Sequence, residues 1–344
     1  MTIELSDIDR RLLDLIQRAV PLASRPYARL AELLSADEAN IIERVAALSR
    51  PGGLIREIAG IFDAAAMGCA STLVGAEVPD ELLEQAGLTV AAHPGVSHCY
   101  QRHGPLNLWF TLLVGPDSTL GLDGTIRVLA ELIGARRIHS FPTLRRYKLD
   151  VHFAMSEEDA PPAAAPGEPA GLAAAAAPAA GSIDKREIRA IRALQTPLPA
   201  TAEPFGLIGK PHGLSGEDVL AAGRSLLARG WMRRYSAVLH HRAAGAAVNV
   251  MAAWRVPDDE ADAFGARAAA IPNISHCYLR RTYPDWPYSL YTMVHAADQA
   301  QADGVIARLS EAGFPHLSLA SGREFKKAKV RLFSPELRQW EAER

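Results

Sequence analysis

A duplication within the chain constrains its fold more than any other feature. The tetrapeptide Ser-His-Cys-Tyr occurs at 97–100 and again at 275–278, a spacing of 178 residues (276 − 98). Tyr147 and Phe325 lie at the same spacing, each among Lys and Arg. A repeat of domain size that occurs only twice predicts two similar halves, packed as a covalent pseudo-dimer within one chain. Further assembly into a homo-oligomer stays open at this point.

Each half begins with helical patterns and continues into a mixed pattern. In the first half, apolar periodicity predicts helices over 3–17, 26–34 and 37–48, followed by a strand over 54–58. Residues 61–150 then follow the order β-α-β-β-α-β, closed by a strand over 144–151, which is typical of a ferredoxin-like domain. We therefore predict an α+β fold that combines a winged helix-turn-helix with an α/β sandwich in each half.

The composition changes sharply between the halves. From 156 to 181 the sequence is mainly Ala, Pro and Gly without apolar periodicity, which is typical of a linker. Pro and Gly interrupt the second helix-turn-helix between 203 and 213, so we expect a degenerate form there. The predicted segments are a winged helix-turn-helix over 1–60, a ferredoxin-like domain over 61–155, a linker over 156–182, a degenerate winged helix-turn-helix over 183–235 and a second ferredoxin-like domain over 236–344.

Composition also excludes several classes of function. With 37 Lys and Arg against 39 Asp and Glu, the net charge is −2, so no overall basic field attracts nucleic acid. The expected recognition helix, 36–44, carries three acids and one base, which disfavours DNA binding. Neither a signal-peptide pattern nor an apolar run of membrane-spanning length is present. The three cysteines show no CxxC pairing, so we expect reduced thiols and a cytoplasmic protein.

Each Ser-His-Cys-Tyr copy lies in an expected hairpin that carries polar side chains where a core strand would carry Val and Ile. Strand alternation places the His, the Tyr and the Arg of each copy on one face. These residues are His98, Tyr100 and Arg102 in the first copy and His276, Tyr278 and Arg280 in the second. The cysteine of each copy points the other way, which disfavours a Cys–His nucleophile. A histidine satisfied inside a sheet is the alternative interpretation, and the sequence leaves open which face is accessible.

The second hairpin is richer in aromatic side chains, and basic residues precede it. His240-His241-Arg242 stands where the first half has Phe62-Asp63-Ala64. Rings and guanidinium groups together suit a flat, highly anionic ligand, because rings stack on its plane and guanidinium groups pair with its carboxylates. Aromatic stripes more often belong to a core, but here the rings lie among Pro and Asp in a turn. The aromatic residues of this hairpin are Tyr283, Trp286, Tyr288 and Tyr291.

These motifs resemble a known family. A winged helix joined to a ferredoxin-like domain is similar to the Lrp/AsnC regulators. The strings Ser-His-Cys-Tyr-Gln-Arg-His and Asn-Leu-Trp-Phe-Thr, within 97–111, resemble the A-type (D-type) subunit of the siroheme decarboxylases. The strings at 240–245 and 276–292, with Tyr-Pro-Asp-Trp-Pro-Tyr, resemble the B-type (L-type) subunit. The resemblance covers both halves except the linker, and it implies a D–L fusion with an Lrp/AsnC-type α+β fold.

The resemblance implies a carboxy-lyase that converts two acetate side chains of siroheme to methyls, giving 12,18-didecarboxysiroheme in heme d1 biosynthesis. The macrocycle accepts the charge left by CO2, so no added cofactor is required, and the iron belongs to the substrate. Histidine suits proton delivery near neutral pH. We assign catalysis to His98, His276, His241, Tyr100 and Tyr278, with His241 as an alternative axial ligand to the substrate iron. We assign substrate binding to Arg102, His103, Trp109, Arg145, Arg146, Arg242, Arg280, Arg281, Tyr283, Trp286, Tyr291, Arg323 and Lys326.

Two other classes of function stay open. One is an Lrp/AsnC-type transcription regulator that senses a small ligand, and the other is a heme-binding carrier without turnover. The acidic recognition helix disfavours the regulator. Two His/Tyr/Arg sets disfavour the carrier, because binding heme without turnover requires fewer polar groups. The expected partners are siroheme, its didecarboxylated product and other heme d1 biosynthesis proteins, with no membrane.

Overall fold

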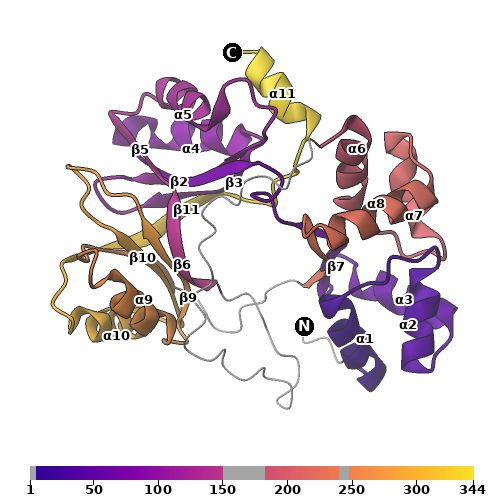
Figure 1. Ribbon diagram of the computed structural model, residues 1–344. Coiled ribbons are helices and arrows are strands. Elements are labelled where there is room, and N and C mark those ends of the chain that lie inside the picture. Colours follow the sequence, from indigo (N-terminus) through magenta and orange to yellow (C-terminus); the bar gives the residue numbers. More distant parts are fainter. Residues whose placement is uncertain (1–4, 150–182, 240–247) are drawn as a thin grey trace. The chain divides into compact units, whose positions relative to one another are not determined.

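The computed structural model describes residues 5–149, 183–239 and 248–344. The chain forms two compact units (Figure 1). The helical unit combines Met1–Cys69, Ala175–Arg242 and Arg331–Ser334, and the sheet unit combines Ala70–Ala174, Ala243–Val330 and Pro335–Arg344. Each unit therefore draws on both halves of the duplication. The predicted linker lies outside the described residues, and the five segment boundaries stay predictions.

The helical unit contains the same arrangement of three helices and a strand twice. Its elements are α1 (Asp7–Arg18), α2 (Pro26–Leu34), α3 (Glu38–Leu48), β1 (Ile55–Phe62), α6 (Lys185–Leu194), α7 (Pro204–Gly209), α8 (Gly216–Ala228) and β7 (Met232–Leu239). Ser6 and Ser215 precede α1 and α8 and form reciprocal capping hydrogen bonds with Asp9 and Asp218. The Pro- and Gly-rich interruption of the second half shortens α7 to six residues, followed by a 3-10 turn.

β1 and β7 pair antiparallel, with Ile58 opposite Ala237. This ribbon takes one strand from each half, so the two helical sets share one core. Tyr27 and Tyr235 are buried in the unit, and the Leu198 amide donates to the Ile58 carbonyl at 2.8 Å. The helical unit is therefore a pseudo-dimer in its own right. Within the described ranges, no helix combines the length and apolarity that a membrane span requires.

In the part of the sheet unit that the structure describes, nine strands follow the order β5-β2-β4-β3-β11-β8-β10-β9-β6. The strands are β2 (Ala70–Glu77), β3 (Val96–Arg102), β4 (Leu108–Val114), β5 (Arg137–Phe141), β6 (Thr143–Leu149), β8 (Val248–Trp254), β9 (Ile274–Arg280), β10 (Leu290–Ala296) and β11 (His316–Lys327). The helices are α4 (Leu83–Ala92), α5 (Gly121–Leu132), α9 (Ala261–Ala269), α10 (Gln299–Ser310) and the C-terminal α11 (Pro335–Ala342). Figure 1 shows α4 and α5 beside the strands of the first half, and α9 and α10 beside those of the second. Two apolar cores lie between these helix pairs and the sheet. The predicted α+β class is confirmed.

The halves exchange their last strands. β6 of the first half pairs with β9, and β11 of the second half pairs with β3 as well as with β8. The prediction that a strand over 144–151 completes the first half's own sheet was wrong, because β5 takes that place beside β2. Pro142 lies between β5 and β6. A proline has no amide hydrogen for the ladder, so the sheet pairing ends there and β6 pairs elsewhere.

Each exchanged strand packs an aromatic ring against a helical glycine. Tyr147 of β6 lies over Gly265 of α9, and Phe325 of β11 lies over Gly87 of α4. A Cβ atom on Gly265 would lie 2.6 Å from the Tyr147 ring. The helices approach the strands this closely only because glycine has no side chain. The aromatic residues that recur at a spacing of 178 are thus contacts between the halves.

Candidate active site

The sheet face away from the helices encloses a cavity of about 380 Å³. Its lining extends from Leu73 on β2 to His276 on β9, so the sheet curls around it. Both hairpin motifs contribute their His, Tyr and Arg side chains to this lining. The cysteines of the motifs, Cys99 and Cys277, are buried in the cores beneath the helices. The His/Tyr/Arg face is therefore the accessible one, and a volume of this size suits a small-molecule site.

The two motif histidines have matched surroundings. The Ser97 Oγ atom lies 2.9 Å from Nδ1 of His98, and the Ser275 Oγ atom lies 2.6 Å from Nδ1 of His276. Both rings are half-buried in the lining. A hydroxyl group at one ring nitrogen fixes the orientation of the imidazole, which proton transfer at a defined atom requires.

Two largely buried arginines make the cavity cationic. Arg102 Nη1 donates to the Leu319 carbonyl at 3.0 Å and to Ser321 Oγ at 3.2 Å, whereas Arg280 Nη1 donates to the Phe141 carbonyl at 2.5 Å. Burial lowers the pKa of each guanidinium to about 10, so both remain charged at neutral pH. The described residues that line the cavity include no carboxylate. An anionic ligand would meet two positive charges that no acidic side chain of the lining neutralises.

Aromatic side chains supply the flat parts of the lining. Burial raises the pKa of Tyr100 and Tyr278, so both phenols stay protonated and can donate hydrogen bonds. Trp109 and Tyr291 also line the cavity. Trp286 packs against Trp109 at a ring distance of 5.8 Å, and its Nε1 donates to the Tyr291 hydroxyl at 2.8 Å. The position of the Tyr291 ring is thus set by a side chain outside the lining.

The second hairpin is longer than the first. The Arg102 amide donates to the Asn107 carbonyl, and the Arg280 amide donates to the Ser289 carbonyl. These closing pairs are 5 and 9 residues apart (107 − 102 and 289 − 280), so the second loop is four residues longer. The second hairpin therefore carries a four-residue insertion.

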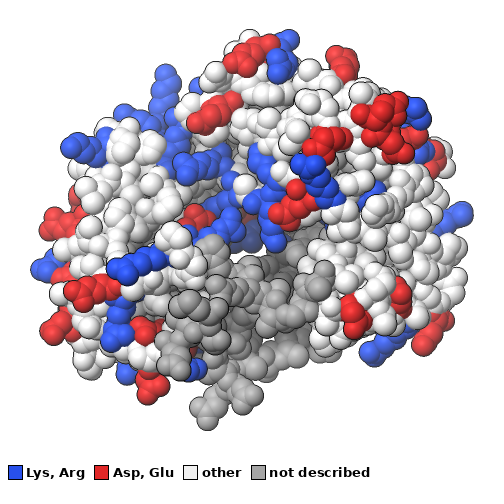
Figure 2. All heavy atoms as spheres, turned by 180° about the vertical axis from the view of Figure 1, so that it is seen from behind, with Lys and Arg blue, Asp and Glu red and all other residues white. Residues whose placement is uncertain are grey.

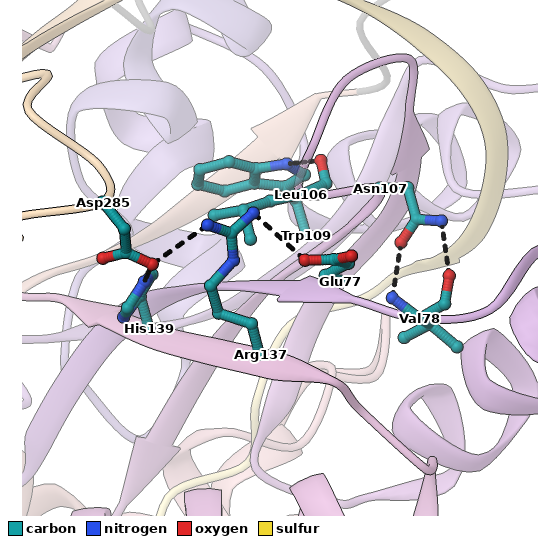
Figure 3. Close-up of polar contacts among 8 residues, drawn as sticks. All are labelled: Glu77, Val78, Leu106, Asn107, Trp109, Arg137, His139 and Asp285. Carbon is teal, nitrogen blue, oxygen red and sulfur yellow. Dashed lines mark hydrogen bonds and ion pairs between the residues drawn. The ribbon is translucent and has the colours of Figure 1, made fainter.

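The longer loop attaches to the edge strand of the other half. Asp285 accepts hydrogen bonds from Arg137 Nη1 and His139 Nε2 of β5, both at 3.0 Å, and Arg137 also pairs with Glu77 of β2 at 3.1 Å (Figure 3). The Tyr283 ring stacks on the His139 ring at 4.1 Å. The loop therefore fastens the second half to the first, close to where Trp109 donates to the Leu106 carbonyl in the same view.

The structure separates the predicted site residues into three groups. Eight line the cavity: His98, Tyr100, Arg102, Trp109, His276, Tyr278, Arg280 and Tyr291. Eight others are described but lie outside the lining: His103, Arg145, Arg146, Arg281, Tyr283, Trp286, Arg323 and Lys326. Among these, Arg145 pairs with Asp262, Arg323 pairs with Glu84, and Lys326 Nζ donates to the His93 carbonyl at 2.9 Å. His241 and Arg242 lie outside the described residues.

Five polar residues of the lining were not predicted: Thr111, Asn249, Thr292, His295 and Lys327. β11 has register shifts next to Glu324, so simple alternation fails there and Lys327, rather than Lys326, reaches the cavity. Asn249 and His295 are direct partners across β8 and β10. Their signal in the sequence was a polar residue between two apolar neighbours, Val-Asn-Val and Val-His-Ala.

The fold and the site define a class of protein, a duplicated helix-turn-helix chain with AsnC-like ligand-binding domains. An AsnC-like ligand binding domain matches residues 66–148 and 243–326, and a siroheme decarboxylase NirDL-like HTH domain matches 9–56 and 187–233. The siroheme decarboxylase of Hydrogenobacter thermophilus is 31% identical over 339 residues, covering 96% of each chain. The chain belongs to the siroheme decarboxylase family.

Two further relatives refine this assignment. The beta subunit of siroheme decarboxylase from Methanosarcina barkeri is 39% identical over 152 residues, which is 44% of this chain and 100% of that subunit. The crystal structure of the siroheme decarboxylase NirDL in complex with an iron-uroporphyrin III analogue superimposes with a TM-score of 0.79 at 28% identity, covering 98% of both chains. The fused organisation predicted from the sequence is thus found in a relative, while half of this chain matches a separate subunit.

Proposed function

We propose that this protein is a siroheme decarboxylase that removes two acetate carboxylates of siroheme and yields 12,18-didecarboxysiroheme. The observation that carries this is the cavity shared by both halves, with a His/Tyr/Arg set from each and no carboxylate in its described lining. A substrate with eight carboxylates on a flat macrocycle matches both the charge and the aromatic walls. The naming of the relatives and the porphyrin complex of one of them support the same reaction.

The reaction needs a held carboxylate and a delivered proton. As the bond between CH2 and the carboxylate breaks, CO2 leaves, and its electron pair stays on the CH2 carbon, where the macrocycle spreads the charge. One proton added to that carbon gives the methyl group. Arg102 and Arg280 pair with substrate carboxylates, and His98 and His276 supply the proton. Tyr100 and Tyr278 donate hydrogen bonds or act as alternative acids, because their phenols stay protonated.

The remaining assignments belong to the same proposal. His241 is a second acid or an axial ligand to the substrate iron, and no cofactor beyond the substrate takes part. The product feeds heme d1 biosynthesis in the cytoplasm, and the chain works as an intramolecular pseudo-dimer. Acidic and basic side chains both occur across the face shown in Figure 2, whereas a nucleic-acid surface would be predominantly basic. DNA is therefore not a partner in this proposal.

Anaerobic incubation of the purified protein with siroheme tests the proposal. Mass analysis of the tetrapyrrole should show the loss of two CO2 units. His276→Ala and His98→Ala should each lower turnover by about 10²–10⁴-fold, the usual contribution of a general acid. His103→Ala should lower it less, because His103 is exposed outside the lining. If all three variants had equal turnover, the assignment of His98 and His276 as proton donors would be wrong. Unchanged siroheme with tight binding to promoter DNA would instead favour a regulator, and unchanged but bound siroheme would favour a carrier.

A further inference from the structure

Strand register places a row of polar residues across four neighbouring strands of the sheet unit. Arg102 on β3 lies opposite Ser321 on β11, and its Nη1 also bonds the Ser321 hydroxyl. Ala320 on β11 lies opposite Val250 on β8, so the next residue pair in this antiparallel register is Ser321 and Asn249. Asn249 lies opposite His295 on β10. Arg102, Asn249 and His295 all line the cavity, so this row combines an arginine of the first half with strands of the second.

The duplication supplies a corresponding row in the other half. Arg280 on β9 lies opposite Thr143 on β6, as Arg102 lies opposite Ser321. Ser71 on β2 lies opposite Leu113 on β4, as Asn249 lies opposite His295. The two rows therefore keep the arginine and differ at the far end, where Asn249 and His295 correspond to Ser71 and Leu113. These replacements remove an amide and a titratable ring from one of the two places, and Leu149 stands there in place of Lys327.

One buried oxygen atom of this polar row has no hydrogen-bond partner among the described residues. It is the Oδ1 atom of Asn249. A buried polar atom without a partner costs free energy, so such an atom in a cavity indicates a partner that arrives with the ligand or through protonation. An imidazolium has two N–H donors where neutral imidazole has one. Directly opposite residues in a sheet are close enough for His295 to use the second donor toward Asn249.

The charges around His295 favour an anion there. The charged groups of the lining that act on it are Lys327 from β11 and Arg102 from β3, the other imidazoles of the lining are His98 and His276, and the described lining has no carboxylate. Burial, with Lys327 and Arg102 as secondary causes, lowers the pKa of His295. The ring is therefore neutral in the empty cavity at neutral pH. A carboxylate placed between Lys327 and Arg102 would stabilise the imidazolium. It would offset the effect of burial and of the two positive charges, and would raise the pKa of His295 again.

We propose that Arg102, Lys327, His295 and Asn249 bind one carboxylate of the tetrapyrrole, and that His295 takes up a proton as this carboxylate enters. The carboxylate accepts from Arg102, Lys327 and one N–H of the imidazolium, and the other N–H donates to Asn249. This subsite deepens the proposed function and rests on it. Because the corresponding row ends in Ser71 and Leu113, only one end of the cavity couples binding to proton uptake.

The test uses a porphyrin that binds without reacting. Iron uroporphyrin, with eight carboxylates, is titrated into the full chain by calorimetry at pH 7 in buffers of different ionisation enthalpy, which gives the number of protons taken up. His295→Leu and Asn249→Ser copy the residues of the other row, so each exchange is already accommodated at an equivalent position. His295→Gln keeps polarity without titration. His316→Gln, an exposed histidine outside the lining, is the matched control.

The wild type and His316→Gln should take up the same fraction of a proton. His295→Gln and His295→Leu should lose up to one proton of this uptake and bind about 10- to 150-fold more weakly, the effect of one charge-assisted hydrogen bond. Asn249→Ser should reduce the uptake at unchanged stoichiometry. Equal uptake in His295→Gln and the wild type, or none in the wild type, overturns the subsite even if siroheme is still decarboxylated. Uptake that depends on His295 without turnover of siroheme would contradict the proposed function alone. A wild type that does not bind the porphyrin would overturn both.

Discussion

The contact between Tyr147 and Gly265 allows a prediction in which two opposing effects can be separated. Gly265→Ala adds a Cβ atom 2.6 Å from the Tyr147 ring, and the nearest atoms are Cγ, Cδ2 and Cε2 of that ring. These atoms are close to the strand backbone and cannot swing away as the end of a long side chain could. The Tyr147 hydroxyl also donates to Asp262 of the same helix at 2.6 Å, which holds the ring in place. The substitution therefore forces the exchanged strand away from the helix.

The size of the effect follows from two contributions of opposite sign. Overpacking of this kind costs about 1–3 kcal/mol. Alanine in the middle of a helix is about 1 kcal/mol better than glycine, and Gly265 lies within α9. The net loss of stability is about 0–2 kcal/mol. In a Tyr147→Ala background the clash is absent, so the same substitution should stabilise the protein by up to about 1 kcal/mol. The sign of its effect thus depends on the residue at 147.

Urea unfolding followed by tryptophan fluorescence measures this, because Trp109, Trp254, Trp286 and Trp340 report on the sheet unit. With a slope of about 3 kcal/mol per M, the midpoint of Gly265→Ala should fall by up to about 0.7 M. Gly304→Ala is the matched control: this glycine lies within α10, and an added Cβ would meet nothing within 4 Å. The control should raise the midpoint. If Gly265→Ala raises it by the same amount in both backgrounds, the ring contact has no energetic role and the reasoning fails.

Two further predictions concern pH and chain continuity. His93 is buried, and burial lowers its pKa from 6.5 to about 4, so the folded state favours the neutral ring. Stability should therefore fall as pH decreases from about 6.5 toward 4, by roughly 3 kcal/mol in total, and His93→Gln should show a smaller drop in urea midpoint between pH 7 and pH 5. Cleavage at a protease site inserted within 156–182 should leave both halves associated in gel filtration without denaturant, because β6 pairs with β9 and β11 with β3. Separation of the fragments would contradict the importance of these pairings.

Local signals in the sequence were sufficient to predict most helices and strands, but they did not predict which strands pair with each other. The capping serines Ser6 and Ser215 begin the helices that follow them, because a cap acts within one turn of its own residue. The partner of β6 depends instead on residues far away in the chain. Pro142 ends the pairing of β5, but nothing in its neighbourhood says that the next strand will meet β9. The recurrence of Tyr147 and Phe325 at a spacing of 178 residues indicated that the two strands are equivalent, but it did not predict which strands they pair with.

The site residues, too, could be predicted only where the strand geometry is regular. His98 and His276 could be placed on one face with their neighbouring Tyr and Arg, because alternation is regular along β3 and β9. Lys326 was chosen and Lys327 missed, because the register shift between Glu324 and Lys326 places Lys326 opposite Cys99 and Lys327 opposite His98. The aromatic turn around Trp286 was interpreted as a binding wall. It contributes from behind the lining, because the four-residue insertion gives it enough length to reach β5 of the other half.

The exchanged strands also explain what a fused chain makes possible. Arg102 belongs to the first half but completes a row with Asn249 and His295 of the second. In an assembly of identical halves the two rows would be equal, and an asymmetric macrocycle would bind in either of two orientations with the same free energy. With Ser71 and Leu113 in one row, the orientation that puts a carboxylate beside His295 gains a charge-assisted hydrogen bond. A gain of about 1.5–3 kcal/mol corresponds to a preference of about 10- to 150-fold for that orientation. Divergence at Asn249, His295 and Lys327 is therefore enough to give a pseudo-symmetric cavity a direction, provided that both halves stay in one assembly.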